Sequence, residues 1–399
     1  MSEQMILEWD RDQLRVLSLT GGGRHFQVLA AGTLPTAEHV DPSVSAKTVG
    51  DAIREWLNSQ GIPLGDVDVV LPRDAVVVRR LQLPHAPDDE LPDLVRFQAA
   101  TKASTSMDHL VLDYLKIPGA DAAQGLSVMT MTIDRDQLSR LTAVLSAAGL
   151  SVRTVGVSPL TVARLVELVG HAHLGEKQAD VVVFQNQGRV EVTVLNHGTL
   201  VLSHALRLPV QDGVVEPQSL KSELARLMVA RTQAGESNEV GRCFYVSGHT
   251  DEGVKEILHK RLGVEVESID LSGVVTAGDV RGYESLLGAA TREHGEKLHL
   301  DFLAPRKKRE IPDRRKLYWG VGIALALLVA STAYLVFQSK KSALESSIEG
   351  LVDRELDLDK QLKAGEPRVL AHERLAEWNE SRADTVELWT RIQQHLPTT

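Results

Sequence analysis

The stretch from Leu317 to Phe337, LYWGVGIALALLVASTAYLVF, contains no charged residue. As an α-helix with a rise of about 1.5 Å per residue it would be roughly 30 Å long, which matches the hydrocarbon core of a bilayer. Aromatic residues near both ends, such as Trp319 and Tyr334, are typical of helices that cross a membrane interface. We therefore predict a transmembrane helix at 317–337; the alternative is a buried helix of a large soluble domain.

The charges that flank this stretch predict its orientation. Basic residues crowd the side that precedes it, whereas two lysines and then acidic residues follow it. The residues before it are Arg306, Lys307, Lys308, Arg309, Arg314, Arg315 and Lys316, and those after it are Lys340, Lys341, Glu345, Glu349 and Asp353. The positive-inside rule places the N-terminal side in the cytoplasm. The basic cluster is either only a topology signal or also a site for anionic lipid headgroups.

Composition limits the classes of function. The chain has 399 residues, enough for one large or two medium domains besides the membrane segment. Its net charge of -10 argues against nucleic-acid binding by the bulk of the protein. A single cysteine, Cys243, excludes an intramolecular disulfide and a cysteine-based zinc site, and no HExxH motif is present, so we predict no metal site.

Two parts of the chain have the same predicted order of elements, β-β-β-α-β, which indicates an internal structural duplication. In the first part we expect strands at 5–9, 14–19, 26–34 and 67–71 and a helix at 45–60. In the second part we expect strands at 179–185, 189–195, 199–206 and 243–247 and a helix at 217–234. Two such halves facing each other are the layout of the actin-like, ribonuclease-H-like α/β fold, in which a nucleotide lies between the halves.

Further elements lie between and after the two halves. We predict a small α+β insertion at about 84–157, with a helix that starts near Asp88 and buries Leu91, Leu94, Val95 and Phe97. A helix from Ser158 to about Gly170 would then cross to the second half. After the second half we expect helices at 250–262 and 283–294 and a strand at 264–269, followed by an apolar peptide in a charged linker.

Several short segments resemble the family of the type IV pilus assembly protein PilM and of the cytoplasmic part of the type II secretion protein GspL. They are Leu81-Gln82-Leu83-Pro84, Glu90, Val95-Arg96-Phe97-Gln98-Ala99, Leu112-Asp113-Tyr114, Ala147-Ala148-Gly149-Leu150, Ser158-Pro159-Leu160 and Tyr245-Val246-Ser247-Gly248. The peptide Leu300-Asp301-Phe302-Leu303-Ala304-Pro305 is similar to the short cytoplasmic motif of PilN, the single-pass partner of PilM. The whole chain thus resembles a PilM-like module fused to a PilN-like anchor, the arrangement of GspL.

This resemblance implies four regions. They are an actin-like cytoplasmic domain at 1–295, a PilN-like peptide and basic linker at 296–316, the transmembrane helix at 317–337, and an extracytoplasmic helical segment at 338–399. It also implies a single-pass protein of the bacterial inner membrane, with its N-terminus in the cytoplasm and its C-terminus in the periplasm. Its partners would be a cytoplasmic motor ATPase and other bitopic and polytopic platform proteins.

The resemblance favours a structural scaffold that links the motor ATPase to the membrane complex. The alternative is an actin-like ATPase of membrane-associated assembly or cell division, like FtsA, although FtsA is anchored by an amphipathic helix and needs an intact cleft. A third class, a sensor with an extracytoplasmic input, is poorly served by so short an outer segment.

The residues of the expected nucleotide cleft depart from the family pattern. Phosphate binding requires backbone N–H groups in a tight turn, usually with glycine, and an acidic residue for hydrated Mg²⁺. The turn at Asp10 and Asp12 lacks the glycine, the turn at Gly188 lacks the acidic residue, and Gly248 is followed by His249 instead of a second glycine. We therefore predict no enzyme activity and no required cofactor; ATP with Mg²⁺ stays the alternative.

Two segments on either side of the membrane are candidates for protein contacts. We predict that Leu300, Phe302, Leu303 and Pro305 dock in a groove of the cytoplasmic domain, their own or a neighbour's; the alternative is an unattached linker. The residues Leu344, Ile348, Leu351, Leu358 and Leu362 approximate a coiled-coil seam, which favours a homodimer or a bitopic partner. We expect Gly365-Glu366-Pro367 to break this helix. Related chains continue into a ferredoxin-like domain, which is either lost here or cut off at Thr399.

Overall fold

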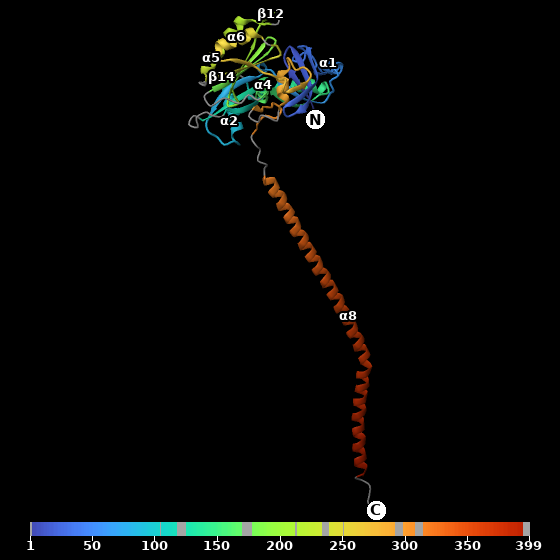
Figure 1. Cartoon of the computed structure of the whole chain (residues 1–399). Helices are drawn as coiled ribbons and strands as arrows, with labels where there is room; N and C mark the ends of the chain where they lie inside the picture. The colour runs from blue at the N-terminus through green and yellow to red at the C-terminus, as the bar shows by residue number, and fades with distance from the viewer. Residues whose placement is uncertain are drawn as a thin grey trace, which may run out of the picture. The chain divides into compact units, whose positions relative to one another are not determined.

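The structure is a computed structural model. It describes residues 2–103, 105–117, 125–169, 178–211, 214–233, 239–249, 251–291, 298–307 and 314–393. The chain forms two compact units, Met1–Arg309 and Glu310–Thr399. Figure 1 shows sheets covered by helices in the first unit and a single long helix in the second. The basic residues Lys308 and Arg309 and the end at Thr399 lie outside the described residues.

The first half contains a sheet of six strands in the order β16-β3-β2-β1-β4-β8. The bounds are β1 Ser2–Trp9, β2 Gln13–Gly22, β3 His25–Pro35, β4 Asp66–Leu71, β8 Ser151–Val157 and β16 Val275–Ala277. Strand β1 runs antiparallel to β2 and parallel to β4. The helices α1 (Ala46–Ser59) and α3 (Arg135–Ala147) pack against each other beside this sheet. β-Branched strands such as β4 are buried on both faces, as the sequence predicts.

The second half repeats this topology. Its sheet has the order β11-β10-β9-β14-β15, so the third, second, first and fourth strands are neighbours as in the first half. The bounds are β9 Gln178–Asn186, β10 Arg189–Asn196, β11 Thr199–Arg207, β14 Glu239–Ser247 and β15 Val266–Ser268, with helices α5 Pro217–Gln233 and α6 Glu252–Leu262. A short hairpin is formed by β12 (Val210–Gln211) and β13 (Val214–Val215). The duplicated actin-like fold predicted from the order of elements is confirmed.

Helix α4 (Ser158–Leu168) connects the halves and packs against α7 (Glu284–Ala290). Both helices are almost fully buried. A Cβ atom on Gly288 would lie 2.0 Å from the carbonyl oxygen of Thr161, so this contact requires a glycine. One apolar core contains residues of both large sheets, which makes the two halves of the first unit a single packed body.

A third, smaller sheet has the order β5-β7-β6 and is covered by helix α2. The bounds are β5 Val77–Leu83, β6 Leu110–Ile117, β7 Leu126–Asp134 and α2 Leu91–Lys102, with short 3-10 turns at Arg73–Ala75 and Met107–His109. The small sheet thus occupies 77–134, whereas the sequence predicted an insertion at 84–157. The difference arises because β8 pairs with β4 in the large sheet and α3 packs on α1.

Two details of α2 also differ from the prediction. The N-cap position is Glu90 rather than Asp88, which instead forms an ion pair with Lys116 at 2.6 Å. Phe97 does not join the buried face, since 66% of its surface is exposed while Leu91 and Val95 are buried. Ala99 instead is the third residue of the buried face, because it lies four residues after Val95 and therefore on the same side of the helix.

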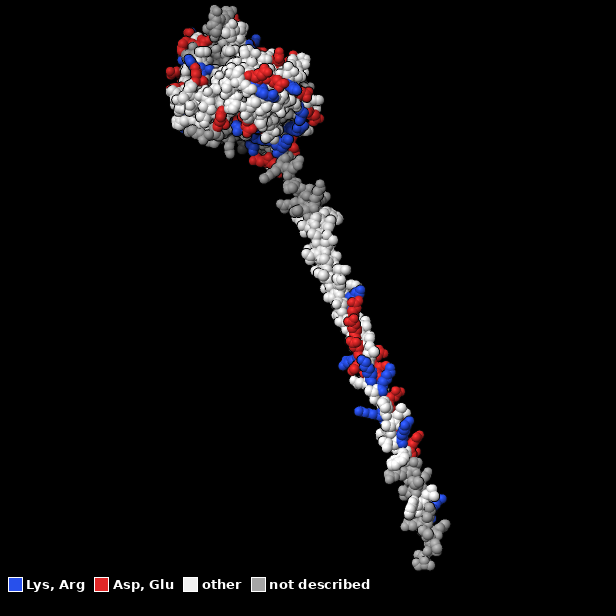
Figure 2. Space-filling view, turned by 90° about the vertical axis from the view of Figure 1, so that its right-hand side faces the viewer, with Lys and Arg blue, Asp and Glu red and all other residues white. Residues whose placement is uncertain are grey.

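The second unit is the helix α8, Arg314–Gln393. In the described part of the chain it is the one helix whose length and composition suit a membrane span, with a window of mean hydropathy 2.2. The predicted break at Gly365-Glu366-Pro367 is wrong, since Pro367 lies inside the helix. A proline removes one backbone hydrogen bond and bends a helix without always ending it. Figure 2 shows an uncharged section of this helix, followed by a section that carries residues of both signs.

Candidate functional site: the cleft and the peptide after it

The turn after β1 places Asp10 at the junction of the two halves, where the actin-like fold would hold phosphates. The Asp10 carboxylate does not face an empty cleft. Its Oδ2 accepts a hydrogen bond from Arg189 Nη1 at 2.6 Å, and its Oδ1 accepts one from Arg207 Nη2 at 2.5 Å. Both arginines belong to the second half, on β10 and β11. Guanidinium groups thus bind the acidic residue from across the cleft.

Arg189 is the centre of a larger buried network. It also donates to Glu8 on β1, and its Nε lies 3.2 Å from Glu191 Oε1. Arg15 on β2 donates to the second oxygen of Glu8. Glu8, Arg15, Arg189 and Glu191 are all at most 3% exposed. The carboxylates of Glu8, Asp10 and Glu191 are thus in contact with the guanidinium groups of Arg15, Arg189 and Arg207.

Further hydrogen bonds hold the acidic members of the network in place. Glu191 accepts from Ser158 Oγ at 2.5 Å and from the backbone N–H of Arg73 at 3.0 Å. Arg207 also reaches Asp74 at 2.6 Å and the exposed Asp12 at 3.2 Å. These contacts tie the start of the small sheet and the crossing helix to the second half.

The surroundings shift the pKa values of the acidic groups in opposite directions. Burial alone would raise the pKa of Asp10, but Arg189 and Arg207 outweigh it and lower that pKa below 3.8. Burial raises the pKa of Glu191 above 4.5, and the nearby Arg189 only partly offsets this. The carboxylates around Arg189 overcome the effect of its burial and raise the pKa of the guanidinium, which therefore stays charged.

The two glycines predicted for the cleft serve close backbone contacts. A Cβ atom on Gly188 would lie 2.5 Å from the carbonyl oxygen of Leu208, and one on Gly248 would lie 2.4 Å from the backbone nitrogen of Gly282. The residue of the β9–β10 turn with a positive φ of 51° is Gln187 rather than Gly188. The structure thus explains both glycines by packing within the first unit.

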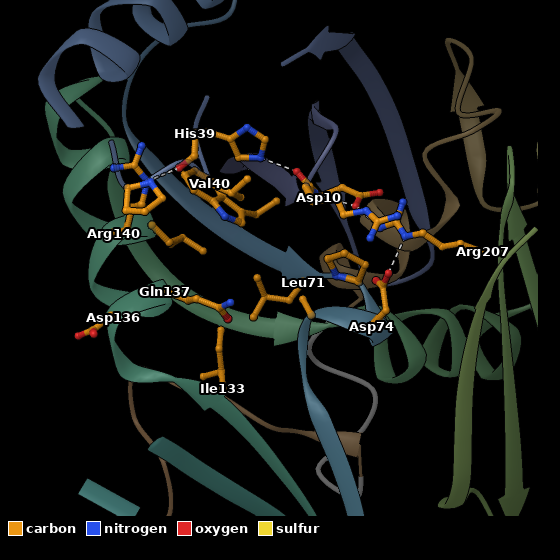
Figure 3. Close-up of a pocket in the computed structure, with 16 residues that line it drawn as sticks. Asp10, His39, Val40, Leu71, Asp74, Ile133, Asp136, Gln137, Arg140 and Arg207 are labelled. Atoms are coloured by element: carbon orange, nitrogen blue, oxygen red, sulfur yellow. Dashed lines mark hydrogen bonds and ion pairs between the residues drawn. The ribbon is translucent and has the colours of Figure 1, made fainter. Parts of the chain in front are cut away.

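A pocket of about 760 Å³ opens beside Asp10, between the β1–β2 turn, helix α3 and the segment around Val40 (Figure 3). Its wall includes Trp9 and His39, whose rings meet edge to face at a centroid distance of 4.7 Å. His39 is fully buried and its ring contacts the carbonyl oxygen of Asp10. Burial lowers the pKa of His39 below 6.5, which favours the neutral ring. Asp136 points away from the pocket.

The peptide predicted to dock is packed against the first unit of its own chain. Leu300 and Phe302 are buried, with 4% and 1% of their surfaces exposed, whereas Leu303 is 37% exposed. The backbone N–H of Phe302 donates to the carbonyl oxygen of Val155 on β8 at 3.0 Å. Asp301 Oδ1 accepts from the N–H of Val155 at 2.9 Å. Of the residues predicted to dock, Leu300 and Phe302 therefore make the apolar contact. Pro305 is half-buried.

Asp113 on β6 holds the end of this peptide. Its carboxylate is buried and accepts the backbone N–H of Asp301 at 3.2 Å and that of Arg306 at 3.1 Å. The guanidinium of Arg306 donates to both carboxylate oxygens at 3.0 Å and lies 5.6 Å from the ring centroid of Tyr114. Arg306, expected in the basic linker, thus belongs to the first unit.

Sequence reasoning missed the residues that fill the cleft. Glu8, Arg15 and Arg189 lie on predicted strands and Arg207 directly follows one, and single charged residues at such positions are usually exposed. One signal existed, since Glu8, Arg189 and Glu191 interrupt or border apolar strands of a duplicated fold. Asp12 stays mostly exposed. In the described part of the chain, no cluster of His, Cys, Asp or Glu side chains is arranged to hold a metal ion.

No protein-family model matches the sequence. No curated protein matches it either. Among solved structures, a chain of the "PilM-PilN type IV pilus biogenesis complex" is similar at 17% identity and a TM-score of 0.54, covering 73% of this chain and 98% of that chain. The cytoplasmic domain of EpsL, an inner membrane component of the type II secretion system of Vibrio cholerae, is similar at 10% identity and a TM-score of 0.43, covering 76% and 98%. The repeated strand order shows that the first unit has the duplicated actin-like α/β fold, and this fold is similar to that of a chain of the PilM–PilN complex.

Proposed function

We propose that this protein is a bitopic inner-membrane scaffold of a type IV pilus or type II secretion-like assembly platform. Its actin-like unit would bind a cytoplasmic motor ATPase, and α8 would cross the membrane with its N-terminal end in the cytoplasm and its C-terminal end in the periplasm. The proposed partners are that ATPase, other bitopic and polytopic platform proteins, and a second copy of the chain.

The observation that carries this proposal is the docking of residues 298–306 against β6 and β8. This segment ends at Arg306, a short distance in sequence before α8 begins at Arg314, and it is attached to the first unit of the chain. Force applied to the actin-like unit would then pass through Phe302 and the Asp113–Arg306 pair into the helix. Such a connection suits a structural relay, which needs rigid contacts rather than turnover.

We further propose that the cleft works without nucleotide. Arg189 and Arg207 bind Asp10 directly, so Mg²⁺ with a triphosphate would have to displace two guanidinium groups from a buried carboxylate. Breaking a buried, hydrogen-bonded ion pair costs about 3–5 kcal/mol. The network would then act as a clamp that holds the two halves in one relative position.

Pull-down of the full-length chain in a mild detergent tests the partner proposal. Recovery of a secretion or pilus ATPase and a polytopic platform protein would support it, and recovery of cell-division proteins instead would reverse it.

Calorimetry with Mg-ATP tests the cleft separately. We expect no binding by the wild-type chain. Micromolar binding that Asp10→Ala abolishes would contradict the nucleotide-free cleft without touching the partner proposal.

A further inference from the structure

A short strap, residues 279–283, connects β16 to α7 and contacts both halves of the first unit. The carbonyl oxygen of its Gly282 accepts a hydrogen bond from Arg15 on β2, in the first half. It accepts another from Asn186 Nδ2, at the end of β9 in the second half, at 2.9 Å. Gly248, which follows β14, packs so closely on the strap that a Cβ atom there would lie 2.4 Å from the backbone nitrogen of Gly282. The peptide group of Gly282 is therefore a point where the two halves meet.

Glu284, the first residue of α7, lies next to this contact point and is almost fully buried. Only 2% of its surface is exposed. Its Oε1 accepts the backbone N–H of Gly282 at 2.9 Å, whereas its Oε2 is buried and has no hydrogen-bond partner among the described residues. A Cβ atom on Gly248 would lie 3.2 Å from Oε1, so the second half closes over this carboxyl group. Because burying a charged carboxylate costs far more than burying a neutral carboxyl group, the site favours the protonated form.

The charged groups that act on Glu284 belong to the strands that pack on α7. They are Arg15 on β2 and Glu8 on β1, and Arg15 already donates to Glu8 and to the carbonyl oxygen of Gly282. Burial raises the pKa of Glu284 above 4.5, and the hydrogen bond from Gly282 and the charge of Arg15 offset this rise only in part.

Other charged groups near α7 have contacts of their own. Arg164 and Glu167 lie on α4, and Asp68 on β4 pairs with Arg153 at 2.5 Å. Within the strap, Asp279 and Arg281 form an exposed ion pair. These groups therefore do not supply the missing partner of Oε2.

We infer that Glu284 is a proton-dependent latch, which holds the two halves together at Gly282 while it is protonated and releases them when its proton passes to water. The ionised carboxylate requires water at Oε2, and water can enter only if a segment packed around the side chain moves away. Gly248 belongs to the other half, so it can move without unfolding α7. Its departure would separate the halves at the strap, while Arg189 still joins them at Asp10. The inference concerns the first unit alone and holds whichever partners that unit binds.

The direction of the pH effect follows from the release of this proton. In the open form Glu284 is hydrated and ionises near its ordinary value of 4.5, whereas in the closed form it ionises at the raised value. Opening thus releases one proton between these two values, and the equilibrium constant for opening should rise by up to about tenfold per pH unit in that window. The strap is therefore closed at low pH and opens as the pH rises.

Hydrogen–deuterium exchange at the backbone N–H of Gly282, measured on the full-length chain in detergent, tests the latch. After correction for the intrinsic exchange rate at each pH, the wild-type rate should increase from about pH 4.5 upward. In Glu284→Gln the side chain keeps an acceptor for Gly282 but cannot ionise, so the corrected rate should not change with pH. Glu252→Gln is the matched control, because Glu252 is 77% exposed and its loss should leave the wild-type behaviour intact. The same pH dependence in Glu284→Gln and in the wild type would overturn the inference.

Asn186→Ala provides a second test that leaves Glu284 in place. It removes the hydrogen bond that the second half donates to Gly282, so the corrected exchange at Gly282 should be about tenfold faster at every pH and should keep its pH dependence. An unchanged rate would show that the strap does not join the halves, and it would refute the inference even if Glu284→Gln did not fold. Neither measurement involves ATP or the proposed partners, so its failure is distinguishable from failure of the proposed function.

Discussion

Replacing Arg189 by methionine tests whether the buried network holds the two halves together. The substitution keeps the length of the side chain and removes the one cation that contacts Glu8, Asp10 and Glu191 at the same time. Removing one partner of a buried ion pair costs about 3–5 kcal/mol, because the remaining charges stay buried without compensation. For a unit of this size, about 2–4 °C of melting temperature correspond to each kcal/mol, so we expect a decrease of about 10 °C.

The assay is differential scanning calorimetry of the full-length chain in detergent, with Arg226→Met as the matched control. Arg226 pairs with Glu223 at the surface and is 75% exposed, so its loss should cost less than about 1 kcal/mol. Arg189→Lys should recover only part of the stability, since an ammonium group lacks the planar set of donors that serves several carboxylates.

The pH dependence provides a second criterion. In the wild type the pKa of Asp10 is lowered, so its contribution to stability is complete above about pH 3.8 and is lost as the pH falls through the lower folded value. In Arg189→Met the carboxylates that have lost their cation can bind protons instead. The loss of stability relative to the wild type should therefore become smaller as the pH falls from 7 towards 4. Equal stability losses in Arg189→Met and Arg226→Met, or a deficit that does not change with pH, would refute the role assigned to the network.

Three further predictions address other parts of the first unit. Asp113→Asn weakens the contacts that hold the end of the peptide, so the backbone N–H of Phe302 should exchange with deuterium at least about tenfold faster, an effect of roughly 1.4 kcal/mol; unchanged exchange would show that Asp113 is not needed for docking. Gly288→Ala brings a Cβ atom against the carbonyl oxygen of Thr161 and should destabilise the unit by about 1–3 kcal/mol in urea denaturation, and a neutral result would contradict the tight helix contact. Burial raises the pKa of Cys243 to about 12, so the thiol should react with iodoacetamide at pH 8 only after unfolding; rapid labelling of the folded chain would show that the strand opens.

The sequence contains enough information to predict the architecture. Apolar runs of β-branched residues between glycine and asparagine turns predict the strands, and the repeated β-β-β-α-β order predicts the duplication that the two sheets confirm. These signals are local, because each depends on residues within about ten positions of one another. The uncharged stretch before Gln338 is local in the same sense, and it lies within α8.

Pairings between distant residues could not be predicted in this way. Arg189 follows Asp10 by 179 positions, and only the packing of one half on the other brings their side chains within 2.6 Å. The strand β16 was not predicted, because three residues at the edge of a sheet carry no periodicity of their own. Pro367 predicts a break because a proline locally disfavours a helix, but the residues on both sides of it continue α8.

The sequence alone therefore determined the class of fold, the position of the apolar helix and the apolar character of the peptide at Leu300 and Phe302, since these depend on the hydrophobicity and spacing of neighbouring residues. The tertiary structure alone decided that Asp10 binds Arg189 and Arg207, and that Asp113 grips the peptide through Arg306. The physical reason is that a charged residue on a strand has the same local pattern whether it faces water or an opposite charge. Only the packing of the whole fold buries such a residue against an oppositely charged side chain and so forms the ion pair.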